Sequence, residues 1–143
     1  MKFQVALLQL LPGSSVQDNM KIGLEACKKA KAMGANLALF PEMWSCGYEI
    51  PEDPASLQAQ AIPDDGSFVS AFSAVAKELE MAVAITFLEQ FEPLPRNTVC
   101  VFDRFGRRIL QYAKVHTCDF GDERRLLPGE DFYTADLDTG CEL

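Results

Sequence analysis

The sequence is poor in histidine, a residue on which many nucleophilic and metal-dependent sites depend. Its 143 residues include one histidine, His116, and one tryptophan. A Ser-His-Asp or Cys-His apparatus would have to be built on that histidine. His116 and Cys118 are the only neighbouring nitrogen and sulfur ligands, and no second pair at ligand spacing accompanies them. We therefore expect no metal site.

Positive charge is also scarce. Thirteen Lys and Arg residues stand against twenty-one Asp and Glu residues, which gives a net charge of −8 and a pI of about 4.6. An acidic surface repels phosphate backbones and anionic lipids, so we expect neither a nucleic-acid nor a membrane partner. No apolar run approaches the length of a membrane span, because the densest, residues 82–88, is interrupted by Thr86.

The five cysteines form no even framework and include no CxxC pair. At least one thiol must stay unpaired, which suits a reducing compartment. The apolar stretch near the N-terminus does not have the pattern of a signal peptide. Gln4 and Gln9 interrupt it, and Pro12-Gly13 closes it without a small-residue cleavage site. We therefore expect a cytoplasmic protein.

The composition that remains, 48% apolar and 24% charged, is typical of a single soluble globular domain. Apolar residues on both alternating faces of residues 3–9 predict a strand buried on both sides. Ser14 stands three residues before Gln17, a spacing that starts a helix, and Gly34 is placed to end that helix. Residues 36–40 predict a second strand, parallel to the first and joined to it by a right-handed crossover.

The rest of the chain predicts one more helix and several strands. A loop rich in Pro, Asp and Ser is expected from Pro41 to about Gly66, and Ser67 is placed to cap the helix that follows. Strands are predicted for residues 82–88, 97–103, 108–114 and 132–137. A glycine within residues 103–107 indicates a hairpin between the second and third of these strands. A polar loop is expected at residues 116–130 and a turn at residues 138–140.

The C-terminal residues Cys141-Glu142-Leu143 follow that turn and have the pattern of the first residues of another strand. A domain normally ends after an element rather than on entering one. We therefore interpret residues 1–143 as one domain that is truncated before its next strand.

Three charged residues are candidates for chemistry. Glu42 lies at the carboxyl end of the second predicted strand, where open α/β sheets place ligand sites, although a solvated acid would also fit there. Lys114 ends the fifth strand and could supply a fixed positive charge, or be an ordinary surface lysine. Glu123 is one of three acids within residues 119–123 of the following loop. Together they could flank one small electrophile as a carboxylate base, a cation and a carboxylate that holds the cation, but a nucleophile is missing.

The ordered set of segments around these residues resembles a known family. Gly34-Ala35-Asn36-Leu37-Ala38-Leu39-Phe40-Pro41-Glu42 is similar to the segment that carries the catalytic Glu of the nitrilase, or carbon–nitrogen hydrolase, superfamily. Arg96-Asn97-Thr98-Val99 and Gln111-Tyr112-Ala113-Lys114-Val115-His116 resemble the segments around its catalytic Lys. Glu123 followed by Pro128-Gly129 is similar to its second Glu, and residues 132–140 resemble the strand and turn that lead to its nucleophile.

The resemblance implies an α/β fold, half of a four-layer α-β-β-α sandwich, in a homo-oligomer. It implies a Glu-Lys-Cys site that hydrolyses a small-molecule amide, carbamoyl or nitrile substrate without metal or organic cofactor. Glu42 would take the thiol proton, Lys114 would stabilise the developing charge, and Glu123 would orient Lys114. The substrate class within these three is left open.

The sequence departs from the family at the nucleophile. The family's Cys lies in an Ile-Cys-x-Asp context on the strand after the turn, and this chain has no such motif. Cys141 comes too early in that strand and lacks the following Asp. We therefore expect no nucleophile in these residues and no activity of the isolated chain. Two alternatives stay open: a non-catalytic binding or assembly module with this fold, and a short enzyme that uses Cys141 or Cys118.

Overall fold

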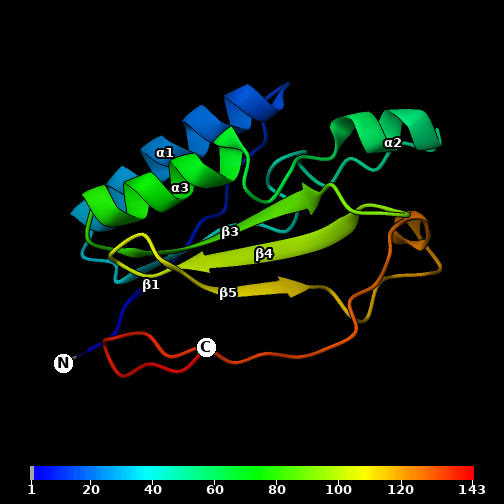
Figure 1. Ribbon diagram of the computed structural model, residues 1–143. Coiled ribbons are helices and arrows are strands. Elements are labelled where there is room, and N and C mark those ends of the chain that lie inside the picture. The colour runs from blue at the N-terminus through cyan, green and yellow to red at the C-terminus, as the bar shows by residue number, and fades with distance from the viewer. Residues whose placement is uncertain (1) are drawn as a thin grey trace.

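The computed structural model describes residues 2–143 and contains one five-stranded sheet with helices on one face (Figure 1). The strands follow one another across the sheet in chain order. Strands β1 to β3 are parallel, and β4 and β5 are added antiparallel. The strands are β1 (Val5–Leu7), β2 (Leu37–Leu39), β3 (Ala82–Glu89), β4 (Arg96–Phe102) and β5 (Arg108–Ala113). The predicted parallel β-α-β unit is confirmed, with shorter strands than the sequence indicated.

Helix α1 (Val16–Ala32) connects β1 to β2. Its N-cap is Ser15, whose side chain accepts a hydrogen bond from the Asp18 N–H at 3.1 Å, so the prediction of Ser14 as the start was wrong by one residue. The Ser14 hydroxyl instead donates to the Asp18 carboxylate at 2.8 Å. Gly34, with a φ of +88°, follows the helix end as expected.

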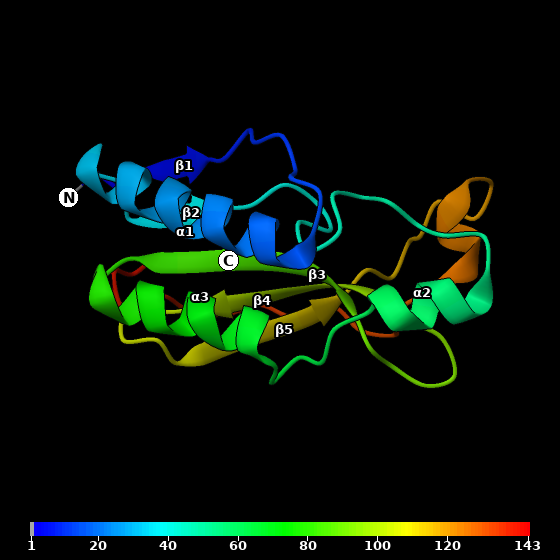
Figure 2. The ribbon, with the colours of Figure 1, turned by 90° about the horizontal axis from the view of Figure 1, so that it is seen from above.

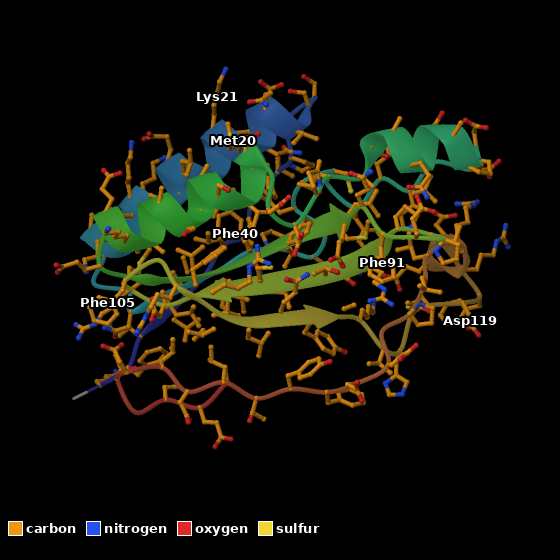
Figure 3. The ribbon with its side chains drawn as sticks, in the orientation of Figure 1. Met20, Lys21, Phe40, Phe91, Phe105 and Asp119 are labelled. Atoms are coloured by element: carbon orange, nitrogen blue, oxygen red, sulfur yellow. The ribbon has the colours of Figure 1, made fainter. Side chains whose placement is uncertain are left out.

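Helix α3 (Ser67–Glu78) packs beside α1 over the sheet (Figure 2). Gly66 is its N-cap and no side chain caps it, so the prediction that Ser67 caps the helix was wrong. An aromatic cluster that includes Phe40 and Phe72 fills the space between the helices and the sheet, where Figure 3 shows Phe40. A Cβ at Gly23 of α1 would come within 3 Å of both rings, so this glycine lets α1 approach the core closely.

Helix α2 (Pro54–Gln60) lies within the segment predicted as a loop. The Asp53 carboxylate accepts a hydrogen bond from the Ser56 N–H at 2.8 Å, and Pro54 occupies the first turn. These are ordinary start signals, but the segment has too few apolar residues to show a helical period. Its buried residue Leu57 packs in a second small core with Met43, beyond the main helix pair (Figure 1).

The hairpin of β4 and β5 is confirmed. The Asp103 carboxylate accepts hydrogen bonds from the N–H groups of Phe105 and Arg107, each at 2.9 Å, and Gly106 has a φ of +78°. The following loop contains the short 3₁₀ helix η1 (Asp122–Arg125).

The C-terminal segment crosses the sheet face that lies opposite α1 and α3 (Figure 1). The strand predicted at residues 132–137 was wrong, because this segment forms only an isolated bridge between Asp136 and Glu142. The predicted turn at residues 138–140 is present, with the Gly140 N–H donating to the Leu137 carbonyl at 2.9 Å. Leu137 packs against the sheet and covers part of this face.

Strand β1 is the edge of the sheet and is buried on one face only. Ala6 and Leu8 pack toward the helices, whereas 44% of Val5 and 68% of Leu7 is exposed. The prediction of a strand buried on both sides was wrong here, because the side chains on the second face of β1 remain exposed. Among residues 2–143 no helix is long and apolar enough to cross a membrane.

Candidate active site

The candidate site lies at the sheet edge where β2, β3 and β5 end. Glu42 follows β2, Lys114 follows β5, and Asn97 near the start of β4 lies between them. Side chains alternate along a strand, and Cys100 and Phe102 point toward the helices. Asn97 therefore points to the opposite face of the sheet.

The structure brings the three residues predicted from sequence into direct contact. The Lys114 ammonium nitrogen lies 2.7 Å from Oε1 of Glu42 and 3.1 and 3.0 Å from the two carboxylate oxygens of Glu123. Both carboxylates therefore accept hydrogen bonds from the same ammonium group. Burial alone would lower the pKa of Lys114, but the hydrogen bonds and charges of the two carboxylates outweigh it and raise the pKa well above its usual range.

Glu123 is the buried member of the site, with a relative exposure of 1%. Its carboxylate accepts hydrogen bonds from the Cys118 backbone N–H at 2.7 Å and from Nδ2 of Asn97 at 2.8 Å, in addition to those from Lys114. Burial would raise the pKa of Glu123, but these hydrogen bonds and the Lys114 charge hold it below its usual value. Both oxygens are occupied, so Glu123 acts as an anchor for Lys114 and has no free oxygen to take a proton.

Glu42 is more open, with 45% of its side chain exposed. Its Oε1 accepts from both Lys114 and Asn97, each at 2.7 Å. No donor among residues 2–143 reaches Oε2. Glu42 therefore combines one fixed oxygen with one free oxygen, the arrangement that a general base needs.

The loop that carries Glu42 is fixed from β3. The Thr86 hydroxyl donates to the Pro41 carbonyl and accepts from the Trp44 N–H at 3.0 Å, which lie on either side of Glu42. Met43 between them has a φ of +52°, a left-handed conformation that a non-glycine residue adopts only when its surroundings hold it there.

Glu42, Asn97 and Lys114 line a shallow pocket of about 280 Å³. Its walls are mostly apolar and include Phe40 and Tyr112. The site thus presents one free carboxylate oxygen and a lysine ammonium beside a small apolar hollow. Within residues 2–143, no three His, Cys, Asp or Glu side chains are arranged to hold a metal ion.

The five thiols lie in different environments. Burial raises the pKa of Cys27 and of Cys100 to about 12, and it also raises the pKa of Cys46. Cys141 packs in the cluster around the first residues of β2 and β3, at the sheet end remote from Glu42. Cys118 has its backbone at the site, through the bond to Glu123.

Sequence reasoning missed two residues of this site, Asn97 and Thr86. Asn97 appeared only as part of the segment that opens the hairpin. The available signal was its strand phase, because Asn97 lies opposite Lys114 across the hairpin, and opposite side chains of paired strands share a face of the sheet. Thr86 appeared only as an interruption of an apolar run, and no local pattern indicates a bond to a loop 45 residues away.

Comparison with known proteins identifies the family. The family description "Carbon-nitrogen hydrolase" matches residues 4–136. The chain belongs to this family. A chloroplastic omega-amidase of Arabidopsis thaliana is 29% identical over 152 residues, and the match covers 97% of this chain and 40% of that protein. The omega-amidase NIT2 of Homo sapiens is 29% identical over 143 residues, with 94% and 50% covered.

Solved structures of carbon–nitrogen hydrolases have the same fold. An amidase from Nesterenkonia sp. superposes with a TM-score of 0.79 at 22% identity, covering 98% of this chain and 53% of the other. A mutant of the amidase from Nesterenkonia sp. AN1 in complex with butyramide gives a TM-score of 0.78 at 22% identity, covering 98% and 53%. The expected α/β fold of the nitrilase type is confirmed. The chain spans about half the length of the relatives it matches.

Proposed function

We propose that this carbon–nitrogen hydrolase chain supplies Glu42, Lys114 and Glu123 to a site that hydrolyses a small-molecule amide, carbamoyl or nitrile bond. The observation that carries the proposal is the Lys114 ammonium held between a buried, saturated carboxylate and an exposed carboxylate with one free oxygen. The amidase activities of the named relatives favour an amide among the three substrate classes.

In the proposed reaction the free oxygen of Glu42 takes the proton of a cysteine thiol. The thiolate attacks the substrate carbon, and Lys114 stabilises the oxygen that becomes negative. The nitrogen of the tetrahedral species takes up the proton that Glu42 received and departs as ammonia. A thioester remains. A water molecule deprotonated by Glu42 then hydrolyses the thioester and returns the proton to the thiol. None of these steps requires a metal or an organic cofactor.

We propose further that none of the five thiols in these residues is that nucleophile and that the 143 residues alone turn over no substrate. The burial of Cys27 and Cys100, the burial that raises the pKa of Cys46, and the remote position of Cys141 support this, and Cys118 is the remaining candidate. Acrylamide is a suitable electrophile. Mass spectrometry should find no selective labelling of Cys118, and ammonia release from small amides should stay at background. Fast labelling of Cys118 that is lost in Glu42→Gln would instead favour the short enzyme.

Binding can be tested without turnover. Butyramide, the ligand of the Nesterenkonia relative, should shift the NMR signals of Lys114 and Asn97 in the ¹⁵N-labelled chain. Lys114→Met should abolish these shifts, and Lys77→Met, on helix α3, is the control. Shifts that are confined to other parts of the chain, or that persist in Lys114→Met, would refute the proposed site.

A second candidate function, association with further copies of the chain, is supported by the exposed edge of β1. Leu7 and Leu11 are 68% and 88% exposed, and a groove of about 430 Å³ runs beside them. An apolar, unpaired edge of this kind favours association, so we propose a homo-oligomer, and the same surface would serve an assembly module. Light scattering should give a mass above the 15.8 kDa of one chain, and Leu7→Lys should reduce it. A monomer at high concentration would refute this association.

The five free thiols support a cytoplasmic location.

A further inference from the structure

Asn97 occupies a special place between the two carboxylates of the site. Its side-chain nitrogen lies 2.7 Å from Oε1 of Glu42 and 2.8 Å from Oε1 of Glu123. An amide NH₂ group has two protons, so each carboxylate receives one of them. The two acceptors also assign the nitrogen and the oxygen of the Asn97 side chain, because an amide oxygen would be repelled by two carboxylates. Asn97 itself is buried, with 6% exposure, on a central strand.

The Lys114 ammonium is already bound by both carboxylates. A negative oxygen on a substrate would therefore compete with Glu42 and Glu123 for the ammonium protons. The contact to Glu42 is the one at the solvent side, because Glu42 is 45% exposed and Glu123 is 1% exposed.

We propose that Asn97 is a positioning residue that holds the Glu42 carboxylate in place while Lys114 exchanges its bond to Glu42 for one to the substrate oxygen. This inference rests on the proposed function of the site. Asn97 and Lys114 donate to the same oxygen of Glu42, so the amide bond remains when the ammonium bond is released. A neutral donor does this without adding a charge that would compete with Lys114 for the substrate. The second amide proton ties Glu42 to the rigid, buried Glu123.

The bridge can be tested in the isolated chain, whether or not it turns over substrate. In a ¹H–¹⁵N spectrum, the two Nδ2 protons of Asn97 should both exchange slowly with solvent. Glu42→Gln should shift mainly one of these protons and Glu123→Gln mainly the other. If both protons exchange as fast as those of an exposed asparagine, or if only one variant has any effect, the bridge is refuted.

The variant Asn97→Leu tests the positioning role. It should raise the midpoint of the Glu123 carboxyl titration followed by ¹³C NMR, because that pKa is lowered in part by the Asn97 hydrogen bond. Thr98→Val is the matched control, since it removes the neighbouring buried hydroxyl that donates to Glu89 on the other face. An equal change in both variants would mean general damage to β4 and would overturn the inference.

Where turnover is measurable, Asn97→Leu should lower kcat by about 10²-fold with a much smaller change in KM, because a misplaced base affects the chemical step. Asn97→Gln should recover part of the loss. A change confined to KM would overturn the positioning role. If butyramide causes no shift at Lys114 while both Asn97 protons stay protected, the proposed function alone is refuted.

Discussion

Lys114 and Glu123 are joined by two hydrogen bonds, with the ammonium nitrogen 3.1 and 3.0 Å from the two oxygens of one carboxylate. The residues are nine positions apart and come from the end of β5 and from η1. The Cys118 N–H and the Asn97 amide complete the shell of Glu123. A buried carboxylate is tolerated here because every oxygen has donors, and its charge in turn fixes the position of the lysine.

Replacing Glu123 with Gln should destabilise the fold. The amide would point a donor at Lys114 or Asn97 and leave one of them unsatisfied, which costs about 1–3 kcal/mol for a buried group. Glu42→Gln is the control at the same lysine, and because Glu42 is 45% exposed its effect should stay below about 1 kcal/mol. Urea unfolding of both variants measures the difference. Equal losses would contradict the anchor role of Glu123.

The stability of the chain should depend on the ionisation of Glu123. Its pKa is lowered below the ordinary 4.5 in the folded state, so the unfolded chain takes up the proton first as the pH falls. The stabilisation is therefore complete above pH 4.5 and is lost as the pH falls through the lower, folded pKa. Unfolding free energies measured from pH 7 to pH 3 should fall more steeply for the wild type than for Glu123→Gln. Parallel curves would show that Glu123 is not linked to folding.

The Thr86 hydroxyl should matter more than its methyl group. Thr86→Val keeps the shape but leaves the Trp44 N–H and the Pro41 carbonyl without their partner, so we expect a loss of about 1–3 kcal/mol in unfolding free energy. Thr86→Ser keeps the hydroxyl and should recover most of it. Thermal unfolding of the pair is the measurement. If Thr86→Ser is less stable than Thr86→Val, packing of the methyl group rather than the hydrogen bonds fixes this loop.

The start of α1 can be checked with two adjacent serines. Ser15→Ala removes the side chain that accepts from the Asp18 N–H and should cost about 1 kcal/mol. Ser14→Ala removes only an exposed bond to the Asp18 carboxylate and should change the stability by less than about 0.5 kcal/mol. Chemical denaturation of both variants decides between the two positions. A larger effect at Ser14 would restore the cap predicted from sequence.

Several elements follow from local signals in the sequence. The apolar period and the glycine at its end specify α1, and the charged turn with Gly106 specifies the hairpin. The sequence also indicated three charged residues that the structure brings into contact, because their order along the chain resembles a known family. These properties depend on neighbouring residues or on the order of segments along the chain, and the sequence shows both directly.

The arrangement of the site depends on tertiary contacts. Asn97 and Thr86 act on residues 26 to 55 positions away, and no local pattern encodes such contacts. Burial also depends on tertiary contacts. Residues 3–9 have apolar side chains on both faces, yet the second face of β1 remains exposed, because burial depends on which elements pack against it. The free oxygen of Glu42 and the saturated oxygens of Glu123 are likewise consequences of packing. Two chemically identical carboxylates thus have different environments, because one is enclosed by donors and the other is open to solvent.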